Sequence, residues 1–411
     1  MADYTISSGR SSQYPETHYG GHFIGTRATF CVDADFPVFD ANTVAIPNLP
    51  VVSLVKTPVT VSDRFFGAHV KYRENDAQAE YAAGSVRSHD LANGKSRWQF
   101  IETSDDVWDF SDLDFFVNTH YAAGHDILFT LFGTPTWASA RPTERNAYSD
   151  QVDGLGQWNR GITAEPSDMA KWDRFCAKIA TRYLGKIKYY EVWNEPNYGN
   201  AGAGATSNVN FYSGTFAKLA EMVRRANQTI KGIDPTAKIV CPALTSWSGS
   251  AGGSAETYFT GMMAASTGDG STTMKDWVDI VGVHLYVGGN TVNNLPKFID
   301  RVKAGMATAG ISSKEIWDTE SAPIGPDVSG LSVSAAKKFI ARSMLVQAAK
   351  GISRTFYYQY DNPTMGVKGL TDILDFMDQT RSLLMGGTIL AAAIFNDGRV
   401  GYYTTNGVLA V

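Results

Sequence analysis

Apolar segments of strand length alternate with segments of helical periodicity through most of this chain of 411 residues. Parallel strands need a crossover connection of a dozen or more residues, usually a helix, so this alternation favours a parallel sheet. Eight such strand–helix units, the number read here, suit a closed (β/α)8 barrel, or TIM barrel, of the α/β class. The strands are expected at residues 65–70, 85–90, 127–133, 187–195, 238–244, 278–286, 316–320 and 354–360, and the helices at 77–83, 113–123, 167–183, 211–230, 295–309, 333–350 and 380–391.

The two ends of the chain do not follow this alternation. Residues 1–60 mix Gly, Ser, Thr and aromatic residues with short β-rich pieces, which predicts a β-rich N-terminal extension. Residues 61–393 are then the catalytic barrel, and residues 394–411 a short β tail with Asn-Asp-Gly and Asn-Gly turn signals. The extension is expected either to pack on the barrel or to attach the protein to a larger assembly or to a second copy.

Composition excludes several classes of partner. The formal net charge is −5 without a run of like charges, so neither nucleic acid nor an anionic membrane surface is an expected partner. No apolar stretch reaches membrane-spanning length, and the first residues lack the basic start and apolar region of a cleavable signal peptide. The compartment is left open. Because no metal-binding His/Cys cluster and no phosphate-binding glycine loop is present, no metal and no cofactor are expected.

Two of the expected strands end in a glutamate and are followed by proline. One ends at Trp193-Asn194-Glu195-Pro196, and the other at Thr319-Glu320, three residues before Pro323. Proline cannot continue a strand ladder, so each carboxylate lies at a strand end, where barrels carry their active sites. Glycoside hydrolysis uses two such carboxylates.

These motifs resemble clan A of the glycoside hydrolases, the retaining (β/α)8 enzymes. Over roughly residues 62–362 the sequence is most similar to family 39 and related endo-glycosidases. The resemblance implies that Glu195 is the general acid/base and Glu320 the nucleophile, with no cofactor. A retaining mechanism requires their carboxyl groups to lie about 5–5.5 Å apart.

The resemblance also implies binding roles for other residues at strand ends. Asn194 would bond the sugar 2-hydroxyl, and Arg87 would bond the nucleophile and hold it ionised. His284 and Tyr286 are spaced i, i+2 and face the same side of their strand, with the tyrosine hydroxyl implied to bond the nucleophile. An ordinary salt bridge for Arg87 and a hydrogen-bonded core pair for His284 and Tyr286 are the alternatives. His69, on the first strand, either lines the sugar site or belongs to the core.

Aromatic and acidic residues near the strand ends complete the prediction. Trp137 and Trp247 are expected in the cleft, where flat rings stack on sugars, whereas Trp193 and Trp317 are expected in the core. Glu191 shares strand parity with Glu195 and is expected to form a buried, structural ion pair.

The sequence therefore predicts a retaining β-glycoside hydrolase. Long loops at 140–165 and 246–255, and the lack of the β-sandwich that family 39 xylosidases usually carry after the barrel, favour endo-action on a carbohydrate polymer, with a bacterial exopolysaccharide or capsule preferred. A virion-borne depolymerase would reconcile such a substrate with the absent signal. The alternatives are an exo-β-xylosidase or β-glucosidase, and a non-catalytic carbohydrate-binding barrel attached to a larger assembly.

Overall fold

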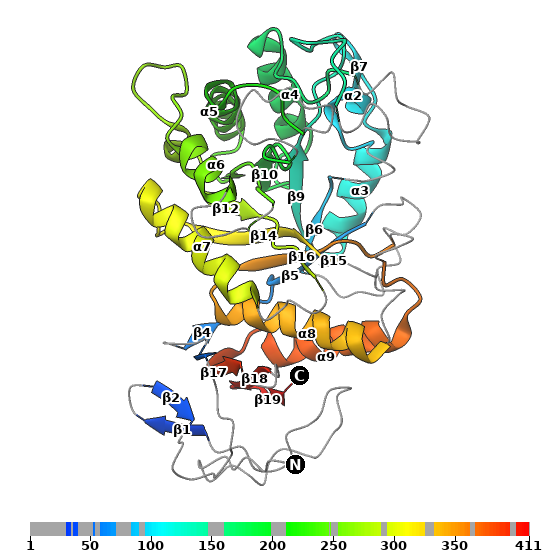
Figure 1. Ribbon diagram of the computed structural model, residues 1–411. Coiled ribbons are helices and arrows are strands. Elements are labelled where there is room, and N and C mark those ends of the chain that lie inside the picture. The colour runs from blue at the N-terminus through cyan, green and yellow to red at the C-terminus, as the bar shows by residue number, and fades with distance from the viewer. Residues whose placement is uncertain are drawn as a thin grey trace.

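The computed structural model describes most of the chain (Figure 1). The described residues are 30–33, 36–39, 52–53, 58–70, 84–89, 95–146, 160–198, 211–245, 247, 254–288, 294–324, 333–361, 366–394 and 400–410. The helix expected at 77–83 lies outside them. The loops expected at 140–165 and 246–255 lie only partly inside them.

Eight parallel strands form a closed barrel in the order β10-β11-β12-β14-β16-β5-β6-β9. The predicted (β/α)8 barrel is therefore confirmed. Every strand is short and buried because both its faces are covered, by the barrel interior on one side and by helices on the other. Its members are β5 (Phe66–His69), β6 (Ser85–Arg87), β9 (Asp126–Leu131), β10 (Tyr189–Val192), β11 (Lys238–Val240), β12 (Ile280–Val283), β14 (Glu315–Ser321) and β16 (Arg354–Tyr357).

Helices surround the barrel, and side-chain caps set the starts of α4 and α5. The Asp168 carboxylate accepts the amide N–H of Ala170 at the start of α4, and the Thr215 hydroxyl accepts that of Lys218 at the start of α5. Among the described helices, none combines the length and the apolarity that crossing a membrane requires. The helices are α2 (Trp98–Ile101), α3 (Ser111–Ala122), α4 (Met169–Arg182), α5 (Phe216–Ile233), α6 (Ser254–Met263), the 3-10 helix η2 (Met274–Asp276), α7 (Leu295–Ala309), α8 (Val333–Ala349) and α9 (Thr371–Leu384).

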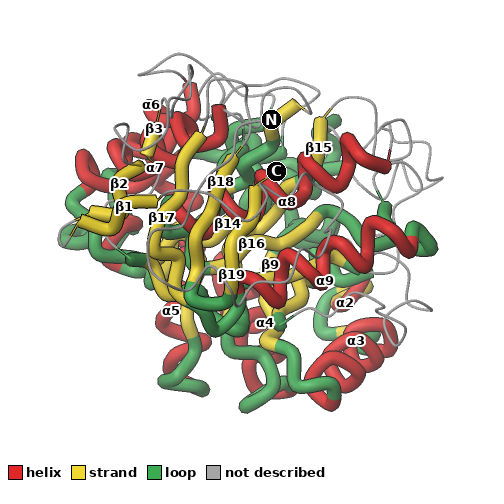
Figure 2. The backbone as a smooth tube through the Cα atoms, turned by 90° about the horizontal axis from the view of Figure 1, so that it is seen from below, coloured by secondary structure: helices red, strands yellow, loops and turns green. Residues whose placement is uncertain are grey.

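Both ends of the chain contribute to one antiparallel sheet outside the barrel. β17 (Thr388–Ile394) pairs with β18 (Val400–Thr404), which pairs with β19 (Gly407–Ala410). β17 also pairs with β3 (Val52–Ser53) and β4 (Val59–Thr60), so the β-rich extension and the β-rich tail are joined. This sheet lies beside α8 and α9 (Figures 1 and 2).

The helix expected at 380–391 is wrong beyond residue 384. Helix α9 ends at Leu384, and residues 388–394 form β17. The alanines of this segment favour a helix locally, but pairing with strands from both chain ends overrides that preference. Small strand pairs complete the fold: β1 (Phe30–Asp33) with β2 (Phe36–Phe39), β7 (Glu102–Ser104) with β8 (Val107–Trp108), and β13 (Val287–Gly288) with β15 (Pro323–Ile324).

A layer of large side chains fills the barrel interior below the site. It consists of Leu128, Val240, Ile280, Trp317 and Phe356. The ring of Phe356 packs directly on the backbone of Gly67 in β5, where an added Cβ would lie 2.5 Å from a ring carbon. No methyl group fits there without moving the ring, so the barrel needs a residue without a side chain at this position.

Replacing Gly67 with alanine should lower the free energy of unfolding by about 1–3 kcal/mol, because the core becomes overpacked. Gly232→Ala is the matched control, since a Cβ there meets nothing within 4 Å. Gly232 lies in α5, where alanine should instead stabilise by up to about 1 kcal/mol. Urea unfolding of both variants would measure the difference, and equal effects would contradict the packing described.

Candidate active site

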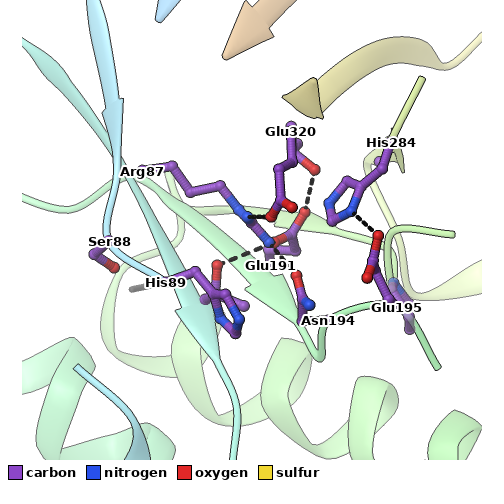
Figure 3. A network of polar contacts seen from close by, with 12 residues as sticks. Arg87, Ser88, His89, Glu191, Asn194, Glu195, His284 and Glu320 are labelled. Atoms are coloured by element: carbon purple, nitrogen blue, oxygen red, sulfur yellow. Dashed lines mark hydrogen bonds and ion pairs between the residues drawn. The ribbon is translucent and has the colours of Figure 1, made fainter. Parts of the chain in front are cut away.

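Polar side chains from several strands meet at the carboxyl ends of the barrel strands (Figure 3). Arg87 is the last residue of β6, and Glu320 lies next to the end of β14. Glu195 follows β10 by three residues, and His284 comes directly after β12. The two glutamates predicted from the sequence are therefore brought to one site.

The Arg87 guanidinium lies at the centre of this cluster and is completely buried. Its Nη1 donates to Glu320 Oε2 at 2.8 Å, and its Nη2 donates to Asn194 Oδ1 at 2.7 Å. Its Nε donates to Glu191 Oε2 at 2.9 Å. One side chain thus joins β6, the β10 end and β14, as only a planar group with several fixed donors can.

Glu191 has all its hydrogen-bonding partners inside the barrel. Besides Arg87, its Oε2 accepts the hydroxyl of Thr130 at 3.0 Å, and its Oε1 accepts the hydroxyl of Thr319 at 2.7 Å. Thr130 stands beside Glu191 in the register of β9 with β10. The predicted structural ion pair of Glu191 is confirmed, and its partner is Arg87.

Glu320 receives donors on both carboxylate oxygens. Arg87 binds Oε2, and the hydroxyl of Tyr286 donates to Oε1 at 2.6 Å. Burial raises the pKa of Tyr286 well above its ordinary value, and the charge of Glu320 raises it further. Tyr286 therefore stays protonated and can act only as a donor to this carboxylate.

Glu195 has a different neighbour. Its Oε1 lies 2.8 Å from Nδ1 of His284, which is buried. Burial alone would lower the pKa of His284, but the negative charges of Glu320 and Glu195 outweigh it, so this pKa is raised. The two carboxylates thus differ in environment: one accepts an arginine and a tyrosine, and the other is bonded to a histidine.

The carboxylates are close together. One carboxylate oxygen of Glu195, one of Glu320 and a ring nitrogen of His284 lie within 4.8 Å of one another. Inverting enzymes need about 6.5–9.5 Å between the carboxyl groups, whereas retaining ones need about 5–5.5 Å. These are also donors that a metal ion accepts, but a cation there would lie beside the Arg87 guanidinium, so the charge of the site fits sugar chemistry better.

Local backbone irregularities direct these side chains. Trp193 has φ of 69° and Glu195 has φ of 44°, both in the left-handed region that residues other than glycine rarely adopt. In β14 the register shifts between Asp318 and Ser321, a bulge that lets the consecutive side chains of Thr319 and Glu320 both reach the Arg87 cluster.

Asp318, within this bulge, points to the other side of the strand. It is fully buried, and burial raises its pKa to about 7. Its Oδ1 accepts the backbone N–H of Leu285 at 3.0 Å. Since Leu285 lies between His284 and Tyr286, this bond fixes the segment that carries both side chains.

Two histidines, one of them the predicted His69, are buried beside Arg87. Nε2 of His69 lies 2.9 Å from the carbonyl oxygen of Thr319 and 3.5 Å from Nη1 of Arg87. His69 is completely buried, so it supports Arg87, and its role in lining the sugar site stays a prediction. Burial, and then the charge of Arg87, hold the pKa of His89 well below its usual value, which keeps this ring neutral.

The two tryptophans predicted for the cleft differ in their burial. Trp247 is 2% exposed, packs on Phe259 and donates its indole N–H to Leu244, so its assignment to the cleft is wrong. Trp137 is half-buried against α4, with the Lys171 ammonium 4.9 Å from its ring centroid. Its indole N–H donates to the carbonyl oxygen of Glu102, and Trp98 packs against it, while its predicted stacking role stays a prediction.

Trp193 and Trp317 are confirmed as core residues, at 0% and 1% exposure. Sequence reasoning missed Thr130 and Thr319, which hold Glu191, and Asp318. Strand parity carried a signal for Thr130, because Thr130 is aligned with Glu191 across β9 and β10. No pattern in the sequence indicated the bulge that brings Thr319 to the same cluster.

The fold and this cluster together define a (β/α)8 barrel with a paired-carboxylate site at the strand ends. No protein-family model matches the sequence, and no curated protein matches it. Solved structures do share the fold. A GH39 β-xylosidase from Caulobacter crescentus is 18% identical with a TM-score of 0.57, and the match covers 85% of this chain and 79% of that one.

Two further structures are similar to the same extent. A glucosidase from Croceicoccus marinus is 16% identical with a TM-score of 0.56, covering 86% of this chain and 76% of that one. A GH39 enzyme from Xanthomonas axonopodis pv. citri is 17% identical with a TM-score of 0.56, covering 89% and 76%. The predicted likeness to family 39 is thus confirmed at the level of the fold.

Replacing Glu191 with glutamine should lower the free energy of unfolding by about 3–5 kcal/mol, because the buried Arg87 charge loses one of its two carboxylates. Asp114→Asn is the matched control. It alters a pair with Arg182 that is 32–43% exposed, and it should cost less than about 1 kcal/mol. Urea unfolding followed by tryptophan fluorescence measures both, and a small, equal effect would show that Glu191 does not compensate Arg87.

Proposed function

We propose that this protein is a retaining β-glycoside hydrolase in which Glu320 is the nucleophile and Glu195 the general acid/base. The observation that carries the proposal is the approach of the two carboxylates within 4.8 Å, each in its own environment. A site built this way can perform double displacement without any cofactor.

In the first step Glu320 attacks the anomeric carbon while Glu195 donates its proton to the glycosidic oxygen, so that the sugar becomes covalently bound and the leaving alcohol departs. In the second step Glu195 removes a proton from water, which attacks the same carbon and releases Glu320. Arg87 and Tyr286 favour the ionised form of Glu320, as a nucleophile requires. Asn194, fixed by Arg87, is proposed to bond the 2-hydroxyl.

His284 is proposed to orient Glu195. Its Nδ1 is 2.8 Å from that carboxylate, and the rest of the ring is packed within the protein. This bond holds in one position a carboxyl group that must give up a proton and later take one back.

For the substrate, we propose a carbohydrate polymer cleaved internally, with a bacterial exopolysaccharide or capsule preferred. The length of the segments that follow β9 and β11 in the sequence supports endo-action. The second candidate is an exo-β-xylosidase or β-glucosidase, which the names of the similar structures favour. A non-catalytic binding barrel is less well supported, because such a barrel would not need the donors arranged around Glu320.

The N-terminal extension is proposed as an attachment segment only for the part before β3. Residues 52–53 and 59–60 pair with β17 of the same chain, so that stretch belongs to the terminal sheet.

Replacing Glu320 or Glu195 with glutamine should each lower kcat/KM by about 10³-fold or more, since one removes the nucleophile and the other the proton donor. Glu315→Gln is the matched control, because Glu315 is exposed at the opposite end of the same strand. An activated dinitrophenyl glycoside with Glu195→Gln should trap the covalent sugar, detected by peptide mass on Glu320. Full activity of both folded variants would contradict the proposed roles.

Incubation with a panel of bacterial exopolysaccharides, xylan, β-glucan and mannan tests the substrate. Endo-action on one polymer should lower the viscosity quickly and release oligosaccharides visible by mass spectrometry. Release of monosaccharides with unchanged viscosity would instead establish the exo-acting candidate. The Glu320→Gln variant serves as the control for contaminating activity.

A further inference from the structure

The turn that follows the proposed acid/base ends in an exposed aromatic ring. Tyr198 is 45% exposed, and its backbone N–H donates to the carbonyl oxygen of Glu195 at 2.9 Å. That bond closes a four-residue turn, whose first and last Cα atoms lie within about 7 Å of each other. The Tyr198 ring therefore lies one turn from Glu195, the residue proposed to protonate the leaving group.

A second ring supports the first. Phe211 stacks on Tyr198 with ring centroids 4.3 Å apart and an interplanar angle of 25°. The carbonyl oxygen of Phe211 accepts the indole N–H of the buried Trp193 at 2.8 Å. Stacking covers one face of Tyr198, and 45% of the residue remains exposed.

The turn itself is held in place from the neighbouring β11 end and from α6. Asn197 exchanges two hydrogen bonds with the backbone of Thr245, at 2.8 and 3.1 Å. The hydroxyl of Tyr258 donates to the carbonyl of Pro196 at 2.9 Å. A ring on so firmly held a turn is preorganised, so binding to it costs little ordering.

Among the described residues, the other exposed large apolar side chains lie on elements that do not carry the proposed catalytic carboxylates. Tyr121 lies in α3, Leu184 follows α4, and Val107 is in β8. Tyr198 alone among them is within the turn of a proposed catalytic carboxylate.

The chemistry fixes which part of a substrate reaches this ring. In double displacement the leaving oxygen departs from the side of the anomeric carbon opposite to Glu320 and receives its proton from Glu195. Strands β10 and β14, which carry these residues, are separated in the barrel by β11 and β12. The leaving sugar therefore extends toward the β10 end, where Tyr198 lies.

We propose that the open face of Tyr198, backed by Phe211, is a stacking platform for a pyranose ring on the leaving-group side of the bond being cleaved. The proposal rests on the proposed function and deepens it. Pyranose rings present a flat apolar face of C–H groups, which is what an aromatic ring with one free face can cover. A substrate with a sugar leaving group gains this contact, and one with a small leaving group does not.

The test compares two kinds of substrate of the same sugar. The leaving group of β-glucosyl fluoride and β-xylosyl fluoride is a fluoride ion, which cannot stack on an aromatic ring. The leaving group of cellotetraose and xylotetraose is a sugar, which can. In Tyr198→Ala, the ratio of kcat/KM for the tetraose to that for the fluoride should fall about ten-fold, within the range of an aromatic contact. Tyr198→Phe keeps the ring and should keep the ratio. Tyr121→Ala, an exposed tyrosine of α3, should leave both rates unchanged.

A second measurement uses the reverse direction. With a glycosyl fluoride as donor, an added sugar acceptor occupies the leaving-group side, and Tyr198→Ala should require about ten-fold more acceptor for half-maximal transfer. An unchanged ratio and an unchanged acceptor requirement would overturn the platform, as would an equal loss on fluoride and tetraose. Absence of wild-type turnover on these probes and on the polymers above would overturn the proposed function, and the platform with it.

Discussion

The buried charge of Arg87 is the interaction on which the rest of the site depends. A guanidinium taken fully out of water must be compensated, and here two carboxylates and an amide oxygen surround it. Glu191 is the partner that stays in place, because Thr130 and Thr319 hold it from the neighbouring strands. Arg87 can therefore present Nη1 to Glu320 in one fixed geometry, and a lysine in its place could not make the three contacts.

This arrangement divides the labour between the two proposed catalytic carboxylates. Glu320 has a cation and a neutral hydroxyl on its two oxygens, and both favour its ionised form. Glu195 is instead bonded to His284, whose own pKa is raised by the negative charges of both glutamates. Environments that differ in this way are how a pair of like side chains takes on different roles.

Much of this could be predicted from the sequence, because it depends on local pattern. The alternation of strand and helix gave the barrel, and the position of Glu195 and Glu320 at strand ends gave the site. The predictions that were wrong concern residues whose position depends on the packing of distant segments. Trp247 follows a strand as a cleft residue would, but the core behind the strand accommodates its ring.

The helix predicted for part of the terminal sheet was wrong for the same reason. β3 and β4 lie more than 300 residues before β17, and only their pairing with it shows that residues 388–394 are not helical. The register shift in β14 is equally invisible, since a strand with strict alternation would send Thr319 and Glu320 to opposite sides. Long-range pairing and single-residue irregularities are not encoded in local periodicity.

The turn after β10 is held by several hydrogen bonds because its backbone conformation is unfavourable. Trp193 and Glu195 both adopt left-handed backbone conformations, which cost of order 1–3 kcal/mol each for residues of this kind. Such conformations persist only where the surroundings over-determine them. The bonds of Asn197 to Thr245 and of Tyr258 to Pro196 do this. They hold Glu195 in place as they hold Tyr198, so the carboxylate that transfers the proton and the ring proposed to bind the departing sugar are positioned by one rigid turn.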